Sequence, residues 1–158
     1  MNKKPWKTYA LWILICEAVG FLAGILTRQG TIEYTKTAIK PPLTPPGWLF
    51  PVVWGILYGL MGIGAARITL ASPSAQRSRG LNWMVTQLIV NFFWPLLFFR
   101  AGAYGFSLLW LLLLWGSVLG MILAWRKVDP AAARLQIPYI LWLSFAVYLN
   151  LGVWCLKP

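Results

Sequence analysis

The sequence predicts an all-α membrane protein in which five transmembrane helices form one bundle. Of the 158 residues, 59% are hydrophobic and only 11% are charged, whereas a soluble domain is about half apolar and about one quarter charged. The chain also divides at its charged residues into five apolar stretches of about 20 residues, the length with which a helix crosses the hydrocarbon core. These observations exclude a soluble globular domain. They also exclude a disordered chain, because a chain this apolar buries its surface.

The five predicted spans are continuous apolar runs without period-two alternation, which favours helices over the strands of a barrel. They cover residues 8–27, 47–69, 81–99, 104–125 and 135–156. The connections between the last four spans are short, and short connections join antiparallel neighbours. The second helix is therefore predicted beside the third, the third beside the fourth, and the fourth beside the fifth. No internal repeat is visible, and residues 1–158 are treated as a single domain.

The connection between the first two spans, from Arg28 to Pro46, is the longest and ends in a proline-rich segment. Proline holds the backbone extended and is tolerated in the first turn of a helix. A stiff loop of this length is either a lid over the mouth of the bundle or a plain rigid connector. The candidate lid prolines are Pro41, Pro42, Pro45 and Pro46.

The distribution of positive charge predicts the orientation. The net charge is +11, but the basic residues stand singly at the ends of apolar runs and form no stripe for a phosphate backbone, so nucleic acid is not an expected partner. Nine of the fourteen fall on the side of the N-terminus, with Lys3, Lys4 and Lys7 among them, and five on the other. Because Lys and Arg are enriched in cytoplasmic loops, we expect a cytoplasmic N-terminus in a bacterial inner membrane, with membrane lipid as a partner.

Several kinds of site chemistry are excluded because the chain has no His and only two cysteines, Cys16 and Cys155. It cannot build a His–Cys metal cage, a Ser–His–Asp triad or a Cys–His dyad. We therefore predict no catalytic residue, no metal site and no cofactor. Glu17 is the one carboxylate within a span, and we expect it to be neutral or hydrogen-bonded inward rather than part of a proton relay.

Aromatic and amide side chains recur at helical spacing on three predicted spans. They are Trp54 and Tyr58 on the second, Gln87, Asn91 and Trp94 on the third, and Trp142, Ala146 and Asn150 on the fifth. Amides in a membrane core cannot face lipid, so the three amides must point inward. Aromatic walls with a few polar anchors suit a planar, mostly apolar ligand. The alternative is that the amides only hydrogen-bond one helix to another.

Other residues have simpler expected roles. Tryptophans near the span ends are expected to anchor the chain in the membrane interface; they are Trp6, Trp83, Trp125 and Trp154. Glycines four residues apart let helices approach closely and predict a homodimer without assigning its face. The pairs are Gly20 with Gly24, Gly55 with Gly59, and Gly116 with Gly120.

Four motif blocks stand in order along the chain. They are Lys40-Pro41 with Thr44-Pro45-Pro46-Gly47-Trp48, the stretch from Trp54 to Gly62, the stretch from Gln87 to Phe99, and the stretch from Pro138 to Asn150. Together these blocks resemble the tryptophan-rich sensory protein, or translocator protein, family, whose mammalian members were called peripheral benzodiazepine receptors. The resemblance spans nearly the whole chain.

The resemblance implies a five-helix membrane bundle, often dimeric, that binds porphyrins and haem-related tetrapyrroles and, in some members, cholesterol and synthetic isoquinolines. Positions matching the family's pocket are Trp54, Asn91, Trp94, Trp142 and Ala146. Without His, a porphyrin or haem ligand would be held by stacking on Trp and by hydrogen bonds rather than by axial ligation.

The chain also departs from the family's pattern. Tyr34-Thr35 stand where the family often has Trp-Tyr, and Leu43 stands where it often has Trp. Leu151 and Cys155 occupy the Tyr and Arg positions of the sterol motif of animal members, which argues against sterol binding.

We therefore expect a membrane protein that holds a porphyrin between Trp54 and Trp142, for transport or sensory regulation. Asn91 and Gln87 would be polar anchors, and the proline-rich loop would close the mouth. Three alternatives remain: light-dependent degradation of porphyrin at the same Trp residues, binding of a lipid or sterol-type ligand, and a structural or stress-signalling role without a saturable pocket. The sequence favours a binding protein but leaves open whether the chain is an enzyme, and it does not separate a carrier from a sensor.

Overall fold

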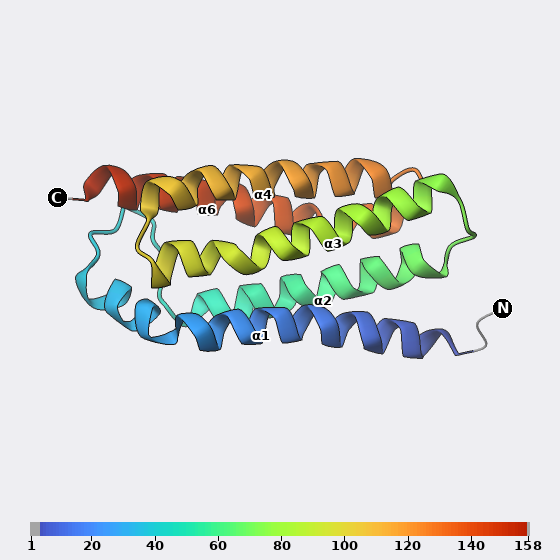
Figure 1. The fold of residues 1–158 in the computed structure, drawn as a ribbon, viewed down its shortest axis with the longest axis horizontal. Coiled ribbons are helices and arrows are strands. Elements are labelled where there is room, and N and C mark those ends of the chain that lie inside the picture. The colour runs from blue at the N-terminus through green and yellow to red at the C-terminus, as the bar shows by residue number, and fades with distance from the viewer. Residues whose placement is uncertain (1–3, 158) are drawn as a thin grey trace.

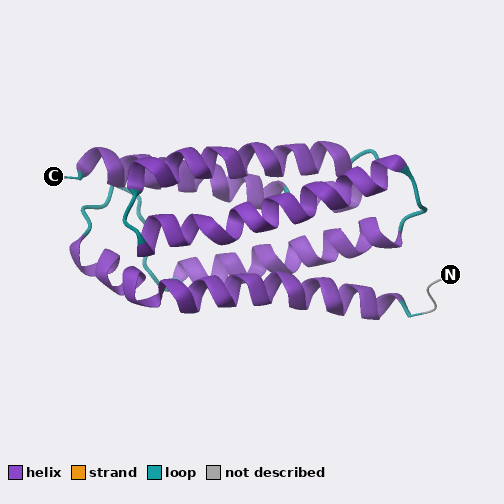
Figure 2. Ribbon diagram, viewed as in Figure 1, coloured by secondary structure: helices purple, strands orange, loops and turns teal. Residues whose placement is uncertain are grey.

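A computed structural model describes residues 4–157, which form a bundle of long helices (Figures 1 and 2). The elements in chain order are α1 (Pro5–Thr37), α2 (Leu49–Leu70), α3 (Ala75–Pro95), the π-helical η1 (Leu96–Arg100), α4 (Tyr104–Trp125), α5 (Pro130–Arg134) and α6 (Ile137–Leu156). No strand occurs among the described residues. Within residues 4–157, five helical segments are long and apolar enough to cross a membrane. The predicted fold class is therefore confirmed.

The prediction of a long loop from Arg28 to Pro46 is wrong, because α1 continues to Thr37 instead of ending at residue 27. Arg28 ends the apolar run but not the helix. The hydroxyls of Thr27, Thr31 and Thr35 donate to carbonyls one turn back along this stretch. The helix ends at Thr37, where Ala38 adopts an extended backbone with φ −74° and ψ 139°, three residues before Pro41. A helix of 33 residues is about 50 Å long, which exceeds the roughly 30 Å hydrocarbon core. The connection to α2 is thus residues 38–48.

Two other boundaries differ from the expected spans for local reasons. Helix α3 begins at Ala75 rather than residue 81, because the Ser74 hydroxyl caps it by accepting a hydrogen bond from the Arg77 amide at 3.0 Å. After Pro95, which has no amide hydrogen to donate, the hydrogen-bond ladder slips by one residue, and the Ala101 amide donates to the Leu96 carbonyl at 2.9 Å. This slip produces η1, which carries two aromatic residues of the site described below.

The helices pack in the order that the short connections predict, with one difference. Figure 1 shows α3 between a pair formed by α1 and α2 and a pair formed by α4 and α6. Helix α3 packs along α4, and α4 along α6, as expected, but α2 contacts α1 far more than it contacts α3. The reason is Gly62, where an added Cβ would lie 2.6 Å from the Ile13 Cα, so the two backbones nearly touch. Between helices in lipid there is no hydrophobic driving force, so association depends on close van der Waals packing. Small residues such as glycine at the contact make this packing possible.

Several predicted glycine faces are used inside the bundle. A side chain at Gly20 would collide with the Tyr58 ring, and one at Gly120 with the Trp83 ring. Gly55 and Gly116 have open space around them instead. The homodimer remains a prediction, and these two glycines are where its face would be sought.

Trp125 is not the interface anchor expected from its position. Its side chain is fully buried, and its indole Nε1 donates to the Gly80 carbonyl at 2.9 Å. Gly64 and Gly80 make room for the ring, since an added Cβ would lie 2.5 Å and 2.9 Å from it, respectively. Trp6 and Trp154 are 64% and 49% exposed at the bundle ends, as an interface anchor should be.

The connections predicted to share one side of the membrane do lie at one end of the bundle. The start of α1, the α2–α3 turn and the α4–α5 turn lie together, and the 38–48 connection, the α3–α4 turn and the end of α6 lie at the other end (Figure 1). Lys3, one of the basic residues counted for the orientation, lies outside the described residues. Which end faces the cytoplasm remains a prediction.

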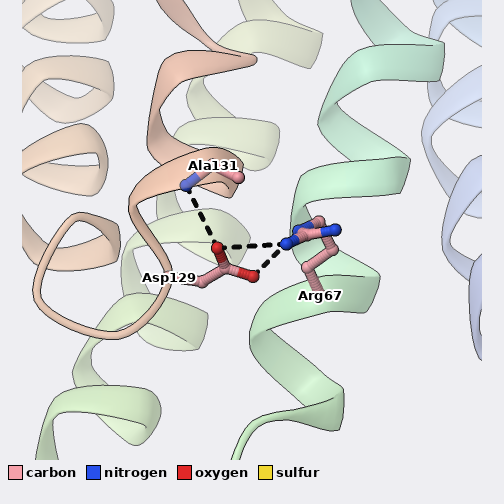
Figure 3. Close-up of polar contacts among 3 residues, drawn as sticks. All are labelled: Arg67, Asp129 and Ala131. Carbon is pink, nitrogen blue, oxygen red and sulfur yellow. Dashed lines mark hydrogen bonds and ion pairs between the residues drawn. The ribbon is translucent and has the colours of Figure 1, made fainter.

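An ion pair ties α2 to the start of α5 at the N-terminal end (Figure 3). Arg67 Nε donates to Asp129 Oδ2 at 2.8 Å and Nη2 to Oδ1 at 3.3 Å, while the Ala131 amide donates to Asp129 Oδ1 at 3.1 Å. Partial burial raises the pKa of Asp129, but the hydrogen bonds and charge of Arg67, together with the backbone amides, outweigh it, so the pKa lies below its ordinary value. Asp129 thus caps a helix and joins two elements.

We predict that Asp129→Asn lowers the free energy of unfolding by about 0.5–1 kcal/mol at neutral pH, as expected for a partly exposed ion pair. Asn still caps α5, whereas Asp129→Ala also removes the cap and should cost about 1 kcal/mol more. Because the pKa is lowered by folding, the pair stabilises fully above the ordinary pKa of 3.8, and this contribution disappears as the pH falls through the lower folded value. Unfolding of the full chain in detergent, followed by circular dichroism against pH, measures both effects. Equal stability of wild type and Asp129→Asn at neutral pH would contradict the assignment.

Candidate functional site

A cavity of about 460 Å³ opens at the end of the bundle that carries the 38–48 connection. Its wall comes from α1, the 38–48 connection, α2, the end of α3 with η1, and α6. This volume lies in the range of small-molecule sites. The aromatic part of the wall consists of Tyr34, Phe50, Trp54, Tyr58, Trp94, Phe98, Phe99 and Trp142.

Most of the residues predicted from helical spacing line this cavity. They are Trp54, Tyr58, Trp94, Trp142, Ala146 and Asn150. Gln87 and Asn91 are buried but are not part of the wall. Of the candidate lid prolines, Pro45 lines the cavity, whereas Pro41, Pro42 and Pro46 do not.

Gln87 and Asn91 lie behind the wall in a chain of buried hydrogen bonds. The Tyr58 hydroxyl donates to Asn91 Oδ1 at 2.6 Å, and Asn91 Nδ2 donates to the Tyr139 hydroxyl oxygen at 2.6 Å. The Tyr139 hydroxyl in turn donates to Gln87 Oε1 at 2.8 Å. This polar chain, defined as Tyr58, Asn91, Tyr139 and Gln87, connects α2, α3 and α6. It uses the amides for contacts between helices, one of the two roles that the sequence left open.

Asn150 reaches the cavity, but its own polar atoms are occupied. Its Oδ1 accepts from Trp94 Nε1 and from the Ser107 hydroxyl, both at 3.1 Å, and its Nδ2 donates to the Tyr104 carbonyl at 2.8 Å. These bonds fix the plane of the Trp94 ring, which stacks on Phe98 with centroids 5.1 Å apart. Asn150 therefore positions an aromatic wall.

Trp142, unlike Asn150, has a polar atom without a hydrogen-bond partner among the described residues. Its indole Nε1 is buried without a hydrogen-bond partner among the described residues, and its side chain lines the cavity. The ring is held in place by Phe50, edge to face with centroids 5.7 Å apart. A buried donor left unpaired costs about 1–3 kcal/mol.

Two cations line the same cavity, and sequence reasoning did not assign them to it. Lys40 Nζ donates to the carbonyls of Thr35 and Ala38 and lies 5.0 Å from the centroid of the Tyr34 ring. Arg28 is exposed and makes no ion pair within residues 4–157. The cavity is therefore apolar inside and positive at its rim. Small residues recurring every three or four positions up to Arg28 are the signal that could have placed this face of α1 at a cavity; they are Gly20, Ala23, Gly24 and Thr27.

The 38–48 connection covers one side of the cavity and contributes Lys40, Thr44, Pro45 and Gly47 to its wall. It is tied to α6, because the Tyr148 hydroxyl donates to the Pro42 carbonyl at 2.6 Å. Gly152 gives room to Pro41, since an added Cβ there would lie 2.6 Å from the proline ring. These contacts hold a loop in which Leu43 has a φ of 70°, a conformation costing a bulky residue about 1–2 kcal/mol.

Comparison with known proteins identifies the family of the chain. The profile of the TspO/MBR family matches residues 12–155, a range that includes the whole cavity wall. The chain belongs to the TspO/MBR family. Together with the five helices able to cross a membrane, this makes it an integral membrane protein.

Relatives of this TspO/MBR member come from bacteria and animals. The tryptophan-rich protein TspO of Chlorobaculum tepidum is 36% identical over 159 residues, covering 100% of both chains. The translocator protein of Homo sapiens is 39% identical over 153 residues, covering 95% of this chain and 90% of its own. The tryptophan-rich sensory protein of Cereibacter sphaeroides is 28% identical over 145 residues, covering 92% and 88%, respectively.

We predict that Asn91→Leu destabilises the bundle by about 1–3 kcal/mol, because the similar-sized side chain leaves the buried Tyr58 hydroxyl without an acceptor. Asn82→Leu is a matched control, since Asn82 is on the same helix but is exposed. Unfolding in detergent measures both variants. Equal stabilities for the two variants would contradict a structural role for the polar chain.

Proposed function

We propose that the protein binds a porphyrin-type tetrapyrrole, free or as haem, in this cavity, and does so for transport or sensory regulation. The observation that carries the proposal is the combination of aromatic walls, one unpaired indole donor and a cationic rim. A tetrapyrrole is a flat apolar macrocycle, and common ones carry carboxylates at the periphery. Each part of the cavity matches one part of such a ligand.

The aromatic walls provide the largest contribution to binding. Trp54, Trp94 and Trp142 offer flat surfaces on different helices, and stacking adds to the burial of apolar area. Trp142 Nε1 can donate to an acceptor on the ligand, which pays back its own unpaired state. Because the chain contains no His, an iron in the ring would not have the usual imidazole ligand, so recognition rests on shape and hydrogen bonding.

The rim selects the charged edge of the ligand. Arg28 and Lys40 both line the cavity from the loop end, so carboxylates on a bound macrocycle would point toward that end of the bundle. Charge-assisted hydrogen bonds of this kind are about twice as strong as neutral ones. The described lining residues include no carboxylate, thiol or imidazole, which suits a site that holds a ligand. The name tryptophan-rich sensory protein, borne by the Cereibacter relative, supports a sensory role.

The test is an absorbance titration of the full chain in detergent, in the dark, with protoporphyrin and with its dimethyl ester, which keeps the macrocycle but lacks the charges. We predict saturation by both ligands. The double variant Arg28→Gln/Lys40→Gln should bind the dicarboxylate about tenfold more weakly and the ester unchanged. Trp142→Phe should weaken both ligands by about fivefold, since it removes the donor and keeps a ring.

Lys36→Gln/Arg100→Gln is the matched control, because both residues are exposed near the same end and neither lines the cavity. Linear, non-saturating absorbance changes, the same in every variant, would mean that porphyrin only partitions into the micelle and would refute the proposal. A second aliquot is illuminated. Recovery of intact porphyrin supports binding alone, whereas a light-dependent product lost in Trp142→Phe would favour the degrading activity instead.

A further inference from the structure

A second cavity, of about 170 Å³, lies at the opposite end of the bundle from the aromatic pocket. It is formed where α3 begins and α4 ends, and its wall includes Gln76, Arg79, Trp83, Gly120, Leu123 and Lys127. We name it the basic cavity. Nothing in the proposed tetrapyrrole site uses these residues.

The polar groups of the basic cavity have no protein partners. The side chains of Gln76, Arg79 and Lys127 make no hydrogen bond or ion pair within residues 4–157, and the Trp83 indole donates to no acceptor there. The nearby carboxylate of Asp129 is engaged by Arg67 at 2.8 Å. Two positive charges and two neutral donors therefore line one hollow without a compensating anion, which is the donor set that a phosphate group requires.

The shape of the basic cavity points to an anion that carries an apolar tail. Gly120 lets the Trp83 ring lie directly on α4, since an added Cβ would be 2.8 Å from the ring, so the indole forms a wall. Leu123 lies in the last turn of α4, four residues before Lys127, and is 43% exposed. Further along the same helix, Leu112 and Leu113 are exposed as well. An apolar surface thus leads away from the cations into the membrane-spanning part of the helix.

We propose that the basic cavity binds the phosphate-bearing headgroup of an anionic phospholipid, with Arg79 and Lys127 on the phosphate and Trp83 donating to a headgroup oxygen. The ends of membrane-spanning helices lie at the headgroup level, where basic residues attract anionic lipid and tryptophan is enriched. One acyl chain of the lipid lies along Leu123 and the exposed face of α4. A free phosphate ion shares the headgroup chemistry but would gain nothing from this apolar surface.

Native mass spectrometry of the full chain in detergent tests the proposal, with phosphatidylglycerol and phosphatidylcholine of the same acyl chains as probes. Wild type should retain one phosphatidylglycerol at a concentration where phosphatidylcholine does not bind. Arg79→Gln/Lys127→Gln should weaken that binding by about tenfold. The matched control is Arg126→Gln/Arg134→Gln, which removes the same charge at the same end from exposed residues outside the cavity and should change binding little.

Three results would overturn the proposal. Equal weakening in the two double variants would mean that net charge alone attracts the lipid. Equal retention of the two lipids would mean that the headgroup charge is not recognised. Displacement of phosphatidylglycerol by inorganic phosphate at the same concentration would assign the cavity to the free ion. Trp83→Phe, which keeps the ring but lacks the donor, should weaken binding a few-fold, and circular dichroism confirms that each variant is folded.

Discussion

In the hydrocarbon core of a membrane no water is available to form hydrogen bonds, so each polar group needs a partner within the protein. This constraint organises the interior of the bundle. Buried amides and hydroxyls of α2, α3, α4 and α6 form hydrogen bonds with one another. Tyr58, Asn91, Tyr139 and Gln87 form one connected set across α2, α3 and α6, and Asn150 joins α3, α4 and α6 through Trp94, Ser107 and Tyr104. These bonds hold the helices that carry the aromatic wall.

Trp142 departs from this pattern, because its indole Nε1 has no hydrogen-bond partner among the described residues. Among the described residues only two buried side-chain polar atoms lack a partner, and the other, Gln136 Oε1, does not line the cavity. Trp142 Nε1 is thus the one buried side-chain donor without a partner among the described residues, and its side chain lines the cavity. Glycines make close packing possible in the same interior. Gly20 makes room for the Tyr58 ring, and Gly62 lets the backbones of α1 and α2 come into contact.

Much of the fold follows from the sequence because the bilayer sets the length and polarity of each span. The inward amides are predictable too, since lipid would not tolerate them, and Gln87, Asn91 and Asn150 are all buried. Which group each amide bonds was not predictable. That choice depends on the axial register between helices far apart in sequence, so the Tyr139 link between Asn91 and Gln87 was missed. The end of α1 was missed because the charge of Arg28 marks the edge of the hydrocarbon rather than the end of the helix. For the same reason Arg28 was assigned to a loop and not to the cavity wall.

The central claim is that Trp142 presents a free donor to the ligand, and the most direct measurement follows the indole N–H resonances of the eleven tryptophans by ¹⁵N NMR of the full chain in detergent. Trp142→Phe assigns the Trp142 signal. The account predicts that protoporphyrin, added in the dark, moves the Trp142 N–H signal downfield as a hydrogen bond forms, while Trp125 Nε1, already bonded to Gly80 at 2.9 Å and away from the cavity, stays in place. An unchanged Trp142 signal at saturating porphyrin would contradict the claim.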